Sequence, residues 1–118
     1  MPPPSPLKIK TSSVTRLIKE EQSYHKELVS QKARLQRMEE NNEDEYEIKQ
    51  QKKVIAETEQ MIPTVQQKLE QAVEAVELQL ELVEEDTDER KAAVSAVEEG
   101  KKIYEGQPSV AGSSLFAD

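Results

Sequence analysis

The chain has 118 residues, a formal net charge of −8, one Phe, three Tyr and no Trp. Bulky side chains are too few to fill a two-layer core, so the composition favours a thin helical bundle, whose seam needs about one apolar residue in every three or four. The absence of cysteine excludes disulfides, thiolate metal sites and thiol catalysis.

The first predicted helix covers residues 13–39. Residues 1–12 are expected to form an extended tail, because four of the first six residues are proline. The hydroxyls of Thr11–Ser13 suit a helix cap, and from Val14 onward apolar residues recur along one helical stripe. The turn-forming cluster Asn41–Asp44 then ends the helix, and its shortness predicts an antiparallel neighbour.

The second predicted helix covers residues 46–84 and carries a seven-residue apolar repeat. The members of the repeat are Ile48, Ile55, Ile62, Leu69, Val76 and Val83. Such a repeat keeps one face turned toward partner helices along the whole length. It passes through Pro63 without losing phase, although proline costs roughly 3 kcal/mol in a helix interior. We therefore expect a continuous helix that is kinked at the proline, with the bend at Ile62.

The third predicted helix covers residues 87–104. The crowded acidic run Glu84–Glu89 ends the second helix, and Asp86 followed by Glu89 resembles a capping box. Three side chains are expected to face inward, and two alanines are expected to allow close approach, while Gly100 weakens the helix. The inward set is Val94, Val97 and Tyr104, and the alanines are Ala93 and Ala96.

These elements predict an all-α fold, an elongated antiparallel three-helix bundle over residues 13–105 with a proline-kinked second helix. Residues 106–118 have little periodicity and many small side chains, and we expect a disordered tail there.

Catalysis is not expected. His25 is the only histidine and has no second histidine or cysteine with which to complete a metal site or a nucleophile pair. The many carboxylates are typical of solvated helix faces, and the three glycines make no phosphate-binding loop. The sequence therefore predicts no enzyme activity, no catalytic residue, no cofactor and no metal.

Charge and hydropathy limit the partners. Residues 1–38 carry eight basic and three acidic residues, a net of +5, whereas the other eighty carry eight basic and twenty-one acidic residues, a net of −13. An acidic chain without aromatic residues interleaved in its basic segment is unsuited to nucleic acid. No apolar window approaches membrane-span length, and MPPPSP lacks the layout of a signal peptide. We expect a cytosolic protein that binds other proteins.

Polar residues interrupt the predicted seam at Glu21, Gln31, Gln51 and Thr58. Such positions lower intrinsic stability unless something fills them. A second copy could do so, which leaves open a homodimer and, as an alternative function, a generic coiled-coil homodimeric scaffold or assembly subunit.

Two segments resemble the tubulin-binding cofactor A family of tubulin-specific chaperones. LKIKTSSVTRLIKEEQSYHKE, residues 7–27, resembles the family's first-helix signature, an I-K-T segment followed by an R-L-x-K-E run and Tyr-x-Lys-Glu. YEIKQQKKVIAETEQMIP, residues 46–63, resembles its second-helix motif. The third helix and the C-terminal tail depart from the family pattern.

The resemblance implies a cytoplasmic, cytoskeleton-associated chaperone that binds β-tubulin monomers during tubulin folding and αβ-dimer assembly, without catalysis or cofactors. Family members occur both as monomers and as dimers. The residues of the matched motifs that we expect to contact β-tubulin are Arg16, Lys19, Tyr24, Lys26, Tyr46, Lys49, Met61 and Pro63. Tyr24 and Tyr46 also lie on or beside the apolar stripe, so a core role is the alternative for both. Basic residues of the first helix would meet acidic tubulin surface, which predicts affinity that weakens as salt rises.

Overall fold

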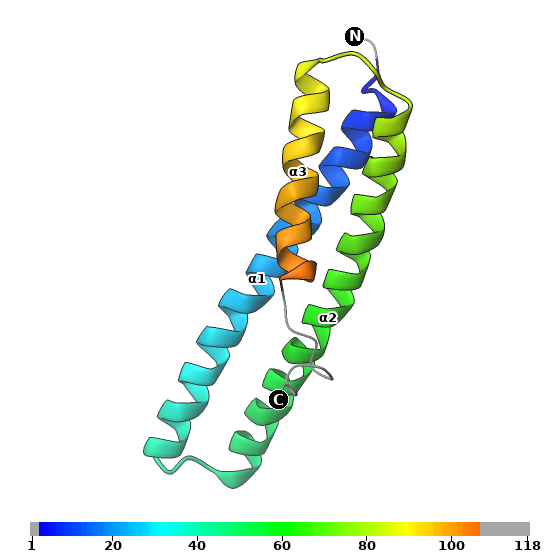
Figure 1. Ribbon diagram of the computed structural model, residues 1–118. Coiled ribbons are helices and arrows are strands. Elements are labelled where there is room, and N and C mark those ends of the chain that lie inside the picture. The colour runs from blue at the N-terminus through cyan, green and yellow to red at the C-terminus, as the bar shows by residue number, and fades with distance from the viewer. Residues whose placement is uncertain (1–2, 107–118) are drawn as a thin grey trace, which may run out of the picture. The chain divides into compact units, whose positions relative to one another are not determined.

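The computed structural model describes residues 3–106, which form three α-helices and no strand. The helices are α1 (Pro6–Glu40), α2 (Glu45–Glu81) and α3 (Asp88–Glu105), as Figure 1 shows. The predicted all-α, three-helix fold is confirmed. The disordered tail expected at residues 106–118 lies, apart from Gly106, outside the described residues.

The contacts divide the chain into two units, where the sequence analysis expected one bundle over residues 13–105. The three-helix unit is described over residues 3–18 and 66–106, and the hairpin unit over residues 19–65. The three-helix unit holds the start of α1, the end of α2 and α3, whereas the hairpin unit holds only the rest of α1 and α2.

The start of α1 lies seven residues before the predicted one, so the extended tail expected at residues 1–12 is wrong from Pro6 onward. Ser5 caps the helix: its Oγ accepts a hydrogen bond from Lys8 N at 3.1 Å, and its carbonyl accepts from Ile9 N at 3.0 Å. Pro6 takes the first helical position, where the missing amide has no helical partner to lose and the fixed φ suits the helix. The hydroxyls predicted as caps lie inside the helix, where Thr11 donates to the Leu7 carbonyl at 2.7 Å.

The predicted turn at residues 41–44 is present and joins two antiparallel helices. Asn42 adopts a left-handed φ of 53°, and Glu43 N donates to the Met38 carbonyl at 3.0 Å, which closes the end of α1 as a Schellman motif. Asp44 then opens α2, because its Oδ2 accepts from Tyr46 N at 3.0 Å. Asparagine tolerates the left-handed region better than most residues, so the sequence favours this turn.

Helix α2 continues through Pro63, as the unbroken apolar repeat predicted. Of the six residues in the repeat, three are buried, Ile55, Leu69 and Val76, and none is exposed. Burial on both sides of the proline offsets the lost hydrogen bond. The bend at Ile62 stays a prediction.

The α2–α3 connection differs from the prediction in two places. Helix α2 ends at Glu81, three residues early, and the Arg90 guanidinium donates to the carbonyls of Leu80, at 3.1 Å, and Val83. The N-cap of α3 is Thr87 rather than Asp86, because the Thr87 side chain accepts from Arg90 N at 3.1 Å. Arg90 therefore joins both helix ends, a role that no capping-box pattern signals.

The three-helix unit contains the better-packed core. Val14, Leu69, Val73 and Val76 are fully buried. Helix α3 runs parallel to α1 and antiparallel to α2, since Gly100 lies against Val14 on the first and against Leu69 and Val73 on the second, while Ser5 bonds Glu89.

The inward face of α3 is close to the predicted one, with one error. Ala93, Ala96 and Val97 are buried, whereas Val94 is 39% exposed. Val94 lies about 100° around the helix from Ala93, outside the narrow arc that Ala93, Ala96 and Val97 share. Tyr104 is half-buried. None of the three described helices has an apolar stretch long enough to cross a membrane.

Candidate functional site

The hairpin unit holds seven of the eight predicted contact residues, and polar groups fill much of its seam. Glu21 is only 4% exposed, and its Oε2 lies 2.6 Å from Nε2 of His25, one turn later. The His25 side chain is itself 46% exposed and partners this buried carboxylate. Thr58 is also buried and donates to the Val54 carbonyl at 3.2 Å.

Across the seam, Gln51 Nε2 donates to the Gln31 main-chain carbonyl at 3.0 Å, while Gln31 Oε1 is buried and accepts no hydrogen bond from any residue of the range 3–106. A buried amide oxygen without a donor costs stability. Two further cross-helix links, Lys32 to Glu59 at 3.6 Å and Lys52 to Glu39 at 3.9 Å, are exposed ion pairs that contribute little. Polar side chains thus occupy the seam of the hairpin unit at Glu21, Gln31, Gln51 and Thr58, each buried or half-buried, and the lower stability expected from them stays a prediction.

The predicted contact residues are largely on the surface. In the hairpin unit, Lys19, Lys26, Tyr46, Lys49, Met61 and Pro63 are exposed, and Tyr24 is half-buried. Arg16 is exposed and belongs to the three-helix unit. Tyr46 is 68% exposed, which rules out the core role that the sequence left open for it. Tyr24 is half-buried, so its core role and its contact role both stay predictions.

Within the hairpin unit these residues form two groups rather than one site. The antiparallel pairing sets Lys32 level with Glu59, so Lys26 on α1 lies near the end of the unit that carries Met61 and Pro63. Tyr46 and Lys49 lie at the turn end, about 22 Å and about 18 Å from Met61 along α2 at 1.5 Å per residue. The contact surface, if continuous, must run along the hairpin.

Two exposed valines beside these residues were missed by the sequence analysis. Val29 is 71% exposed and follows Lys26 by three residues on α1. Val54 is 39% exposed and lies seven residues before Met61 on α2, which is 40% exposed. Both lie out of phase with the buried stripe, and that phase mismatch was the signal in the sequence that could have identified them.

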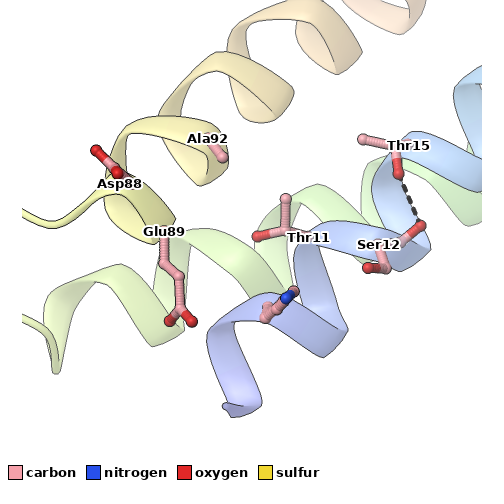
Figure 2. A pocket seen from close by; sticks show the side chains of 7 residues that line it. Thr11, Ser12, Thr15, Asp88, Glu89 and Ala92 are labelled. Carbon is pink, nitrogen blue, oxygen red and sulfur yellow. Dashed lines mark hydrogen bonds between the residues drawn. The ribbon is translucent and has the colours of Figure 1, made fainter. Parts of the chain in front are cut away.

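A groove of about 380 Å³ lies in the three-helix unit, between the start of α1 and the start of α3. Figure 2 shows its lining, which is Lys8, Thr11, Ser12, Thr15, Asp88, Glu89 and Ala92. Two of its hydroxyls are engaged with the backbone of α1, since Thr11 donates to Leu7 O and Thr15 donates to Ser12 O at 3.0 Å. None of the predicted contact residues lines this groove.

Two ionisable groups of the three-helix unit, Lys101 and Tyr104, have shifted pKa values. A hydrogen bond of 2.7 Å to Glu77 raises the pKa of Lys101 above its ordinary value, and burial raises the pKa of Tyr104. Both shifts move titration further from neutral pH, so neither group exchanges protons there. Over residues 3–106, no cluster of three His, Cys, Asp or Glu side chains is placed to hold a metal ion.

Comparisons with known proteins agree on one family. The family model of tubulin binding cofactor A matches residues 2–99. The chain is similar to tubulin-folding cofactor A of Arabidopsis thaliana, with 38% identity over 96 residues that cover 81% of this chain and 82% of that protein. It is also similar to tubulin-specific chaperone A of Saccharomyces cerevisiae, with 31% identity over 99 residues that cover 81% and 93% of the two chains.

Two solved structures share the fold. The crystal structure of tubulin folding cofactor A from Arabidopsis thaliana matches with a TM-score of 0.75 and 35% identity, over 81% of this chain and 92% of that chain. Rbl2p, a β-tubulin binding post-chaperonin cofactor, matches with a TM-score of 0.76 and 29% identity, over 86% and 99%. The chain belongs to the tubulin binding cofactor A family, a family of chaperone cofactors rather than enzymes.

Proposed function

We propose that this protein binds β-tubulin monomers in the cytoplasm and holds them during tubulin folding and αβ-dimer assembly. The observation that carries the proposal is its similarity in sequence and fold to Rbl2p, a β-tubulin binding cofactor, over nearly the whole of that chain. The association with the cytoskeleton would then follow from the client rather than from a direct contact with microtubules.

We further propose that the exposed groups of the hairpin unit make the contact. Lys19 and Lys26 lie one heptad apart on α1 and take part in no ion pair among the described residues. Their ammonium groups are thus available to acidic groups of a client. Met61 and Val54 add apolar area on α2. A surface of this mixed kind releases its client more readily than a large apolar one.

Self-association through the heptad seam of α2, the alternative function, has less support. Leu69 and Val76 of that seam are fully buried within the chain. A second copy could reach them only after α1 or α3 had separated from α2. A dimer formed through another surface is compatible with this packing, and sedimentation equilibrium at several concentrations measures it.

The test compares two charge-reversal variants in the capture of purified β-tubulin. Lys19→Glu/Lys26→Glu alters the proposed contact, and Lys91→Glu/Lys102→Glu changes the same charge on α3, where both lysines are also exposed. We expect the first variant to lose about tenfold in affinity and the second to lose little. Wild-type affinity should also fall as salt rises from about 50 mM to about 300 mM.

Equal losses of affinity in the two variants would show that only the net charge of the protein matters. Lys19 and Lys26 would then not belong to the contact. Affinity that does not change with salt would exclude the electrostatic contribution altogether. Neither result would affect β-tubulin binding itself, which a direct capture experiment measures.

A further inference from the structure

One face of α2 in the three-helix unit carries apolar side chains that no described residue covers. Leu78 is 65% exposed and Leu82 is 77% exposed. Leu78 lies two residues beyond the fully buried Val76, which is about 200° around the helix at 3.6 residues per turn. We call the surface formed by Gln71, Ala75, Leu78 and Leu82 the leucine face.

The spacing within the leucine face is the one that helices use to pack against another helix. Its members are separated by four, three and four residues. This interval keeps the side chains on one seam, as in coiled coils. The helices that already contact α2 do so elsewhere: Arg90 of α3 reaches Leu80, Lys101 of α3 pairs with Glu77, and Lys10 of α1 bonds Gln79 at 3.3 Å.

The charges around the leucine face are almost all of one sign. Residues 69–89 contain nine Asp or Glu and no Lys or Arg. Glu74 and Glu81 lie four residues before and three residues after Leu78, so both border the face. The last turn of α2 has no basic residue. Acidic groups near a helix C-terminus are unfavourable, because the helix dipole is negative there.

Two of the nearby cations are engaged elsewhere, and Lys68, another, lies one turn before Gln71, at the opposite end of the face from Leu82. The Arg90 guanidinium donates to main-chain carbonyls at the end of α2, and Lys101 is engaged by Glu77. Glu74 and Glu81 are exposed and take part in no ion pair among the described residues. Exposed leucines and unpaired carboxylates therefore occur on one surface. A ligand with apolar and basic side chains would cover the leucines and pair with the carboxylates.

We infer that the leucine face binds a cationic amphipathic helix of another protein, separately from β-tubulin capture by the hairpin unit. The apolar stripe of that helix would lie on Leu78 and Leu82, and its lysine or arginine residues would lie against Glu74 and Glu81. This is the helix-on-helix mode of peptide recognition, with charge complementarity selecting the basic partner.

The test uses two synthetic amphipathic helices of about 18 residues, one of leucine and lysine and one of leucine and glutamate. Fluorescence anisotropy measures their binding to the full chain. We expect the lysine peptide to bind, the glutamate peptide not to bind, and Leu78→Gln/Leu82→Gln to weaken binding of the lysine peptide at least about tenfold. Ile9→Gln is the matched control, because Ile9 is a 54% exposed apolar residue of the same unit. Glu74→Gln/Glu81→Gln should make the affinity less dependent on salt.

Three results would overturn the inference. Equal binding of the lysine peptide to the wild type and the leucine variant would show non-specific attraction to an acidic protein. A wild-type dimer that the leucine variant converts to a monomer would assign the face to a second copy. Loss of β-tubulin capture in the leucine variant would assign the face to the client, whereas unchanged capture supports a separate surface. Circular dichroism checks that each variant keeps its helix content.

Discussion

Gly100 of α3 provides a test of the packing in the three-helix unit. A Cβ added there would lie 2.8 Å from Val73 Cγ2, 3.6 Å from Leu69 Cδ1 and 3.7 Å from Val14 Cγ1. The first distance is shorter than real Cβ contacts, and Val73 is a fully buried, β-branched residue with little freedom to move. The sequence suggested only that Gly100 weakens α3. The structure adds that Gly100 lets α3 approach α2 closely.

The magnitudes decide the sign of Gly100→Ala. Alanine should stabilise the helix by about 1 kcal/mol relative to glycine. Overpacking a filled core costs about 1–3 kcal/mol. We expect a net loss of about 1 kcal/mol in the free energy of unfolding, measured by urea denaturation. In a Val73→Ala background the obstructing methyl group is gone, so Gly100→Ala should instead stabilise by about 0.5–1 kcal/mol.

Ser95 supplies the control, because it is an exposed position of the same helix. The difference between Ser95→Gly and Ser95→Ala measures the helix propensity of α3 without a packing contribution, and we expect about 1 kcal/mol. If Gly100→Ala stabilised the wild type by that same amount, the close approach of α3 to Val73 would be wrong.

Three further changes test other parts of the structure. Thr87→Ala removes the N-cap of α3 and should cost about 1 kcal/mol in urea denaturation, whereas Thr87→Ser should cost little; equal values for the two would deny the cap. The pKa values of Lys101 and Tyr104 are both raised, so the folded state holds their protons more tightly than the unfolded state, and stability should fall as pH rises above about 10. Tyr104→Phe with Lys101→Met should flatten that decline, and an unchanged slope in thermal denaturation across this pH range would contradict it. Pro63→Ala restores an amide donor inside α2 and should raise stability by about 1–3 kcal/mol while weakening β-tubulin capture; unchanged capture would remove Pro63 from the proposed contact.

The elements that the sequence predicted well are those fixed by periodicity over many residues. The seven-residue repeat of α2 predicted both the continuity of the helix through Pro63 and the inward direction of Ile55, Leu69 and Val76. A run of residues that all favour the same face leaves little room for another arrangement. The turn at residues 41–44 was equally local, because Asn42 can adopt a left-handed φ.

The errors lie where a single residue competes with its neighbours. Proline near Ser5 indicated an extended tail, yet the same proline is favourable at the first position of a helix once Ser5 caps it. Asp86 matched a capping pattern, but Thr87 takes that place while Arg90 caps the end of α2. Such choices depend on groups brought together by folding, so local sequence cannot rank them.

The candidate contact residues were harder to predict than the fold. Helical phase separates inward from outward positions, and it could have placed Tyr46 and Val29 on the surface. Phase does not say which part of a long charged surface meets a client. The role of Gly100 was also out of reach, because it depends on the distance between two helices and not on either one.

The most direct test of the account is whether the tagged protein retains β-tubulin in the absence of α-tubulin. The protein is added to cytosolic extract, recovered, and the two tubulins are quantified in the same eluate. We expect β-tubulin in clear excess over α-tubulin in the eluate. Recovery of the two tubulins in equal amounts, or of neither, would contradict capture of the β-tubulin monomer.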